Sequence, residues 1–108
     1  MSHDLIRLTA TEAVAKLRAG DVTPLELIDA AAARIEAVEP AVNALPTLCL
    51  DRARDHARAL MRGERREAEG EAGWLAGLPG AIKDLTEVGG VRTTFGSPIF
   101  ADYVPERS

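Results

Sequence analysis

The feature that most constrains the fold is helix punctuation, which the first part of the chain carries twice. Thr9 and Glu12 have the spacing of a capping box, in which the threonine hydroxyl and the glutamate carboxylate each accept a free backbone N–H. The residues that follow place one apolar face on a helix, and Gly20 then supplies a residue that tolerates positive φ. The sequence therefore predicts a helix over about 10–19.

A second helix start follows almost at once. Thr23 and Glu26 repeat the capping-box spacing, and Pro24 occupies the first helical position, where its missing N–H costs nothing. Pro40 cannot continue helical hydrogen bonding, so we expect it to end this helix and predict a range of about 24–38. A long apolar stripe runs along the predicted helix: Leu25, Ile28, Ala32, Ile35 and Val38.

Two short apolar segments predict strands, with a third helix between them. The first covers about 44–50, and Pro46 places it at a sheet edge or at the beginning of its strand because proline lacks an N–H. The second covers about 79–85, after a polar, glycine-punctuated loop that includes 63–73. Asp51 is placed to cap a helix over about 51–62. This order of helices and strands is the opening of an α/β layered domain.

The predicted sheet is incomplete, because two strands are too few for a sheet that is covered on both faces. Either the chain forms a homo-oligomer that completes the sheet, or more chain belongs after Ser108. The segment 104–108 carries no terminating signal, so we expect a truncated product, with 1–108 forming part of a single domain.

Composition narrows the classes of function. Thirteen basic and 17 acidic residues give a net charge of −4, which argues against nucleic acid or an anionic membrane as a partner. One cysteine allows no internal disulfide and, without a signal peptide or spanning segment, indicates a cytoplasmic protein. Two isolated histidines and one cysteine give no metal-ligand spacing, and no cofactor motif is present.

Lys83 is the candidate catalytic residue, because its neighbours in the second predicted strand are small or apolar. A lysine in a strand that is covered on both faces loses hydration, which favours the neutral amine. A neutral amine is a competent general base for a hydroxyl nucleophile. The alternative is a structural lysine whose ammonium reaches solvent or pairs with Asp84.

Other candidates have a structural and a functional interpretation each. Asp84 either bonds to a backbone N–H and fixes the following loop, or is a solvated carboxylate. Ser97 either lines a substrate path or belongs to a plain turn. Cys49 is better interpreted as a small core residue than as a nucleophile, since no basic neighbour activates it. Gly89–Gly90 is a candidate hairpin loop and does not fit a phosphate-binding P-loop.

The chain resembles the amidase signature family in several ordered segments. The family shows a G-[IL]-P-x-x-[IV]-K-D strand and, shortly after it, a G-x-x-T-[TS]-x-[GA]-S stretch. Gly77–Asp84 (GLPGAIKD) has the form of the first motif, and Gly90–Ser97 (GVRTTFGS) has the form of the second. Leu17–Leu27 is similar to the paired opening helices of the family. The resemblance covers nearly the whole chain from about Leu8 onward and implies an α/β/α layered fold.

The resemblance implies a Ser–cis-Ser–Lys triad, in which the lysine deprotonates one serine and that serine activates the nucleophilic serine. Lys83 matches the lysine of the family. The two serines of the family lie in a Gly- and Ser-rich stretch well downstream, which this sequence does not reach. Ser97 and Ser108 are the only serines after Lys83, and neither has such a context. Lys83 alone is carried over, and the chain by itself is expected to be inert.

The function implied by the resemblance is hydrolysis of a carboxylic amide C–N bond in a small-molecule substrate, without a cofactor or metal. Two alternatives stay open. One is a small acidic α/β binding module that uses its open sheet edge, and the other is the amide-cleaving subunit of a tRNA-dependent amidotransferase. The residues do not record which amide is cleaved, so ureas, aryl amides, fatty amides and peptide amides all remain candidates.

Overall fold

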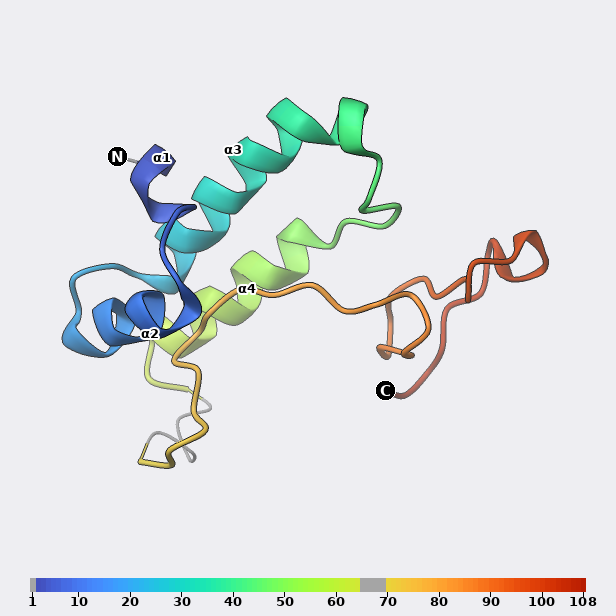
Figure 1. Ribbon diagram of the computed structural model, residues 1–108. Coiled ribbons are helices and arrows are strands. Elements are labelled where there is room, and N and C mark those ends of the chain that lie inside the picture. Colours follow the sequence, from blue (N-terminus) through green and yellow to red (C-terminus); the bar gives the residue numbers. More distant parts are fainter. Residues whose placement is uncertain (1, 65–69) are drawn as a thin grey trace.

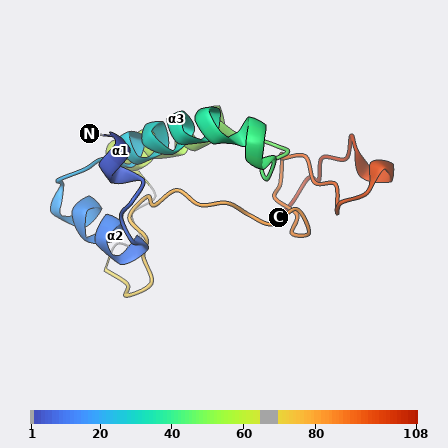
Figure 2. The same cartoon turned by 45° about the horizontal axis from the view of Figure 1, so that its top comes forward.

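A computed structural model describes residues 2–64 and 70–108 of the chain (Figure 1). The four α-helices lie together in the first part of the chain, before residue 62. Most of the chain after residue 70 is irregular and extends to one side of the helices (Figures 1 and 2). The elements within these ranges are α1 (Ser2–Leu5), α2 (Ala10–Ala19), α3 (Pro24–Val42), α4 (Leu50–Met61) and the 3-10 helix η1 (Pro98–Phe100).

Both predicted capping boxes are present at the starts of α2 and α3. At α2 the Glu12 N–H donates to Thr9 Oγ1 over 3.1 Å, and the Thr9 N–H donates to Glu12 Oε1 over 2.9 Å. These bonds from Thr9 hold the pKa of Glu12 below its ordinary value, because they favour the carboxylate form. The box at α3 has 3.1 Å for both bonds, between Thr23 and Glu26. The starts of α2 and α3 are therefore set by residues that the sequence places next to them, whereas α4 begins at Leu50 without a side-chain cap, so the predicted cap by Asp51 is wrong.

The end of α3 differs from the prediction, because Pro40 lies inside the helix and does not end it. The helix ends at Val42, and its C-cap residue Asn43 adopts a left-handed φ of 51° and donates its N–H to the Glu39 carbonyl over 2.7 Å. The Glu39 carboxylate then accepts the N–H groups of Ala44 at 2.9 Å and Leu45 at 2.5 Å. A proline removes one helical hydrogen bond, and these bonds just beyond it stabilise the last turn.

The two predicted strands, 44–50 and 79–85, are absent, and no strand forms within residues 2–64 and 70–108. A strand is stable only when its N–H and C=O groups pair with a neighbouring strand, and neither segment has such a neighbour in the described chain. Cys49 is exposed at the start of α4, so its interpretation as a core residue is wrong. All regular elements of the described chain are helices, and the α/β layering is not visible in it.

The hydrophobic core is small and lies between the first helices. Ala13, Val22 and Leu27 are buried in it, and partly buried leucines pack against them: Leu5, Leu8, Leu17 and Leu78. Leu78 is the member from the second half of the chain. The core therefore fixes the chain shortly before the candidate base.

The segment 74–78 is also held by polar and steric contacts. The Arg18 guanidinium donates to the Trp74 carbonyl over 2.8 Å and lies 5.8 Å from the centre of the indole ring. Gly77 has a φ of +95°, and a Cβ at this position would lie 2.7 Å from Pro24 Cγ. These contacts attach the segment that leads toward Lys83 to α2 and to the start of α3. Of the predicted loop 63–73, residues 65–69 lie outside the described residues.

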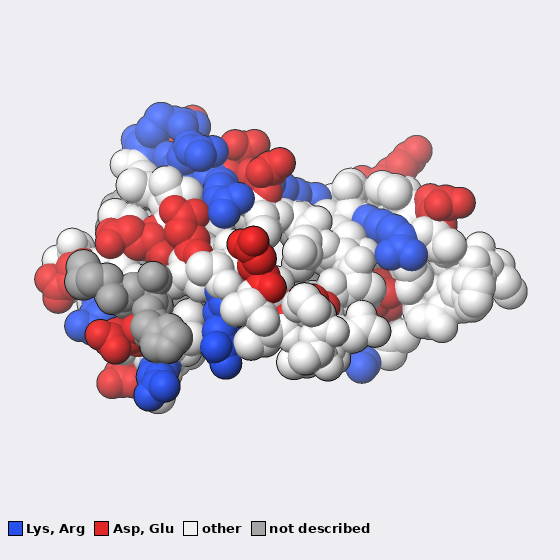
Figure 3. All heavy atoms as spheres, turned by 90° about the horizontal axis from the view of Figure 1, so that it is seen from above, with Lys and Arg blue, Asp and Glu red and all other residues white. Residues whose placement is uncertain are grey.

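Acidic and basic side chains alternate on the face shown in Figure 3, without a continuous patch of one sign. Neighbouring opposite charges form surface ion pairs, for example Arg54 with Asp29 at 3.1 Å and Arg58 with Asp55 at 3.2 Å. No helix in the described part of the chain has the length and apolar character needed to cross a bilayer.

Candidate functional site

Lys83 lies in irregular chain and is exposed. Its carbonyl accepts the Thr86 N–H over 2.9 Å, so a turn follows it directly. The apolar neighbours Ile82 and Leu85 are also exposed, at 65% and 58% of their accessible surface. The expectation that Lys83 is buried in a covered strand is therefore wrong for this structure, because no element in the described part of the chain packs over the segment.

Asp84, the next residue, is bound through both carboxylate oxygens to Thr94. Oδ1 accepts the Thr94 N–H over 2.8 Å, and Oδ2 accepts a short hydrogen bond from the Thr94 hydroxyl. The hydroxyl and backbone donors of Thr94 hold the pKa of Asp84 below its ordinary value, because both favour the ionised form. The interpretation of Asp84 as a residue that fixes the following loop is confirmed. It pairs with Thr94 and leaves the lysine beside it exposed.

The loop around Thr94, which binds Asp84, is itself held by burial and by backbone hydrogen bonds. Thr94 and Thr93 are buried, with 9% and 2% of their surface exposed. The Thr93 N–H donates to the Tyr103 carbonyl over 3.0 Å, and the Gly90 N–H donates to the Pro105 carbonyl over 2.8 Å. Segment 90–93 therefore runs beside segment 103–105 through backbone hydrogen bonds.

Gly89–Gly90 forms the predicted tight turn, without the flanking strands of a hairpin. The Val91 N–H donates to the Val88 carbonyl over 3.0 Å, and these two residues form an isolated antiparallel bridge. The turn also contacts α4, since the Arg52 guanidinium donates to the Gly89 carbonyl over 2.5 Å. The turn therefore joins the irregular half of the chain to the helical half.

Arg92 makes a second connection between the halves. Its guanidinium donates to the Ala101 carbonyl and, over 3.1 Å, to Thr47 Oγ1. The segment before α4 and the segment after η1 are thus held by one side chain. The sequence singled out neither Arg92 nor Thr94 as a structural partner, because both depend on contacts between distant parts of the chain.

Ser97 has the role of a turn residue. Its N–H donates to the Thr94 carbonyl over 2.9 Å, and its hydroxyl accepts the Ile99 N–H at 3.3 Å, which caps η1. The hydroxyl of Ser108 accepts the Gly89 N–H over 2.9 Å. Both serines that follow Lys83 in the sequence therefore use their hydroxyl oxygens as acceptors for backbone groups.

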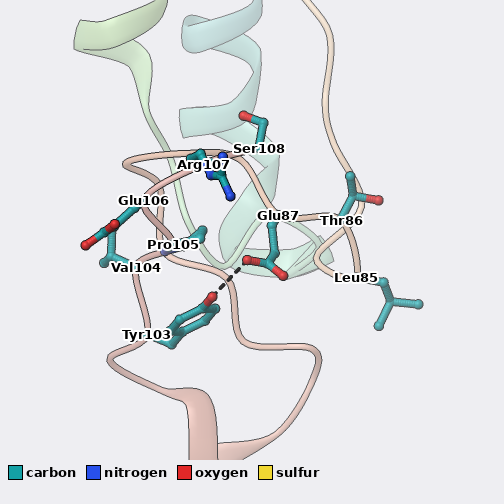
Figure 4. A pocket seen from close by; sticks show the side chains of 9 residues that line it. All are labelled: Leu85, Thr86, Glu87, Tyr103, Val104, Pro105, Glu106, Arg107 and Ser108. Carbon is teal, nitrogen blue, oxygen red and sulfur yellow. Dashed lines mark hydrogen bonds between the residues drawn. The ribbon is translucent and has the colours of Figure 1, made fainter.

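An open hollow of about 820 Å³ lies between segments 85–87 and 103–108 (Figure 4). Within it the Tyr103 hydroxyl donates to Glu87 Oε2 over 2.8 Å. The Glu87 carboxylate that accepts this bond raises the pKa of the Tyr103 hydroxyl, because the bond stabilises the protonated form. Lys83 does not line the hollow, so the hollow is separate from the candidate base.

The arrangement supplies one exposed amine on a backbone that is fixed on both sides. Leu78 fixes the chain before Lys83, and the bonds of Asp84 fix the chain after it. Such a group is accessible to a partner that is brought to it. Among the contacts of the described residues, no nucleophilic side chain is paired with the Lys83 amine.

Comparison with known proteins places the chain. The profile of the family described as Amidase matches residues 26–108. Among curated proteins the chain is similar to three that are each named as the A subunit of Glutamyl-tRNA(Gln) amidotransferase. They come from Streptomyces coelicolor (41% identical over 102 residues), Chloroflexus aurantiacus (46% over 102 residues) and Roseiflexus castenholzii (41% over 101 residues).

Each of these matches covers 94% of this chain and 20% of the relative. The chain therefore spans one fifth of the length of the curated relatives that it matches. No solved structure matches the chain significantly.

Proposed function

We propose that this chain, which belongs to the Amidase family, forms the amino-terminal portion of an enzyme that hydrolyses a carboxylic amide C–N bond. The observation that carries the proposal is the family match over residues 26–108, which includes the motif Gly77–Asp84 and hence Lys83. The match covers 20% of a relative that is about five times as long, which supports placing 1–108 within a longer amidase chain, and we propose that it forms the front of a single amidase domain.

In this proposal Lys83 is the general base of a Ser–cis-Ser–Lys triad. Its neutral amine takes the proton of one serine, which in turn takes the proton of the nucleophilic serine. The nucleophile attacks the amide carbonyl, the C–N bond breaks as the nitrogen is protonated, and water hydrolyses the acyl-enzyme. Both serines would come from the part of the enzyme outside these 108 residues.

The remaining four fifths of such an enzyme would complete the environment of Lys83. Apolar side chains beside it, Ile82 and Leu85, are exposed in the structure, and Ile99 is 86% exposed. We propose that later strands pair with segment 79–85 and cover these side chains, which gives the α/β layered fold of the family. Water would then leave the amine, and its neutral form would be favoured.

A second candidate function follows from the names of the relatives. Proteins that are 41% to 46% identical carry the name of the A subunit of Glutamyl-tRNA(Gln) amidotransferase. This similarity supports the proposal that the enzyme cleaves an amide as one component of such an amidotransferase. The two candidates share the Lys83 chemistry and differ in substrate and partner. We propose the cytoplasm for either one, since a reducing compartment suits a chain with a single cysteine.

Substitution of Lys83 in the whole enzyme tests the proposal. Lys83→Ala removes the base, and Lys83→Arg keeps the positive charge on a group that does not deprotonate. We expect both variants to lose about 10²-fold or more in kcat for amide hydrolysis while their far-UV circular dichroism is unchanged. Wild-type kcat in either variant would contradict the role of Lys83.

A substrate panel separates the two candidates. Ammonia release is measured with glutamine, an aryl amide and a fatty amide, each with and without the other amidotransferase subunits. Glutamine turnover that depends on those subunits supports the amidotransferase. Turnover of a simple amide by the enzyme alone supports the independent amidase.

A further inference from the structure

Lys83 and Asp84 are consecutive residues with opposite environments. Lys83 is exposed, whereas the carboxylate of Asp84 is bound to Thr94 through both oxygens. A carboxylate beside a lysine is placed to form an ion pair with it, yet this one binds a threonine ten residues further along the chain. Asp84 therefore connects the backbone that carries Lys83 to the loop around Thr94.

That loop is a firm support for Asp84. Thr94 is 9% exposed, and its hydroxyl oxygen also accepts the Gly96 N–H at 3.2 Å. Thr93 is held through its N–H by the Tyr103 carbonyl at 3.0 Å. Because these groups are buried and bonded, a side chain attached to them has little freedom to move.

The backbone of Lys83 has few other restraints nearby. Its carbonyl accepts the Thr86 N–H at 2.9 Å, which closes a local turn without tying that turn to another part of the molecule. The last residue of the preceding segment that packs on the core is Leu78. The Asp84–Thr94 contact is thus the nearest tertiary restraint on the position of Lys83 among the described contacts.

We propose that Asp84 is a positioning residue for the amine of Lys83, with Thr94 as its support. The inference rests on the proposed function, since it takes Lys83 to be the base. Proton transfer requires donor and acceptor to lie within hydrogen-bond reach, and a displacement of about 1 Å can lower a rate by roughly 10²-fold. Asp84 holds Lys83 at the correct distance and does not itself exchange a proton with the substrate.

The variant Thr94→Val separates positioning from charge. It removes the hydroxyl that donates to Asp84 and keeps the carboxylate beside Lys83, so the electrostatic effect of Asp84 on the amine stays. Asp84→Ala removes both the bonds and the charge. Thr94→Ser retains both donors and is the conservative variant. The three are made in the whole enzyme and compared by kcat, KM and the pH dependence of kcat.

We expect Asp84→Ala to lower kcat by roughly 10- to 100-fold with KM within about twofold, because ground-state binding does not use the amine. Thr94→Val lowers kcat by a smaller factor and leaves the midpoint of the acidic limb of the pH profile in place. Thr94→Ser restores most of kcat. The double variant Asp84→Ala/Thr94→Val is no slower than Asp84→Ala, since the two residues act through one contact.

A stability control distinguishes positioning from general loss of structure. Thr9→Ala removes a helix cap far from the site, at a cost of about 1 kcal/mol. It should lower the melting temperature while kcat stays unchanged. Equal losses of kcat in Thr9→Ala and Thr94→Val, at matched melting temperature, would overturn the positioning role.

The inference and the proposed function fail differently. If Lys83→Ala keeps its activity, Lys83 is not the base and the triad mechanism of the proposed function is wrong. If Lys83→Ala is inactive while Asp84→Ala and Thr94→Val have wild-type kcat, the base is correct and only the positioning role is overturned.

Discussion

Gly77 offers a quantitative test of how the segment before Lys83 is attached. Its φ of +95° is unfavourable for an L side chain, and a Cβ there would lie 2.7 Å from Pro24 Cγ and 3.2 Å from Leu60 Cδ1. The Pro24 ring is rigid and forms the first turn of α3, so it cannot rotate away. Gly77→Ala should therefore combine backbone strain of about 1–2 kcal/mol with overpacking of about 1–3 kcal/mol.

Gly20→Ala is the matched control. Gly20 has a similar φ of +79°, and a Cβ there would meet nothing within 4 Å. It should carry the strain of about 1–2 kcal/mol alone, while the entropy that alanine removes from the unfolded chain is common to both variants. The difference between the variants, about 1–3 kcal/mol, then measures the contact with Pro24.

Thermal denaturation of the chain, followed by circular dichroism, measures this difference. One kcal/mol corresponds to roughly 4–8 °C for a domain of about this size, so Gly77→Ala should melt clearly below Gly20→Ala. Equal melting temperatures would show that segment 74–78 does not pack on α3. The contact with Pro24 would then not help to fix the chain before Lys83.

Two further predictions concern charge and association. The pKa of Asp84 is lowered from 3.8 in the folded state, so its contribution to stability is complete above that value and is lost as the pH falls through the folded pKa. Melting temperatures from about pH 6 to about pH 2 should fall less steeply in Asp84→Asn, and identical slopes would contradict the Asp84–Thr94 contact. The chain of 108 residues should also self-associate through exposed apolar side chains such as Ile82 and Ile99, and Ile99→Ser should weaken this association. Sedimentation that shows a monomer at all concentrations would refute it.

The sequence predicted the features that depend on neighbouring residues. Thr9 with Glu12, and Thr23 with Glu26, cap their helices because each box needs only residues three positions apart. The role of Asp84 was predicted as one of two alternatives, and its partner Thr94 was not identified. The sequence identifies Asp84 as a hydrogen-bond acceptor, but only the folded chain shows that its donors belong to Thr94.

The predictions that failed concern features that depend on contacts with other parts of the chain. Segments 44–50 and 79–85 have apolar strand composition, yet composition without a pairing strand leaves the backbone unpaired, and neither forms a strand. The burial of Lys83 was inferred from the same strand and failed with it. Pro40 was expected to end α3, and the capping bonds made by Glu39 and Asn43 carry the helix past it.

The contacts that join the two halves have a consequence for the order of folding. The helix caps join residues three positions apart, whereas the side chain of Arg18 reaches a carbonyl 56 residues later and Arg92 reaches Thr47 across 45 residues. Contacts between distant residues form late because a long loop must close first. On a ribosome the helices would therefore form early, and the segment that carries Lys83 would dock onto a surface already in place.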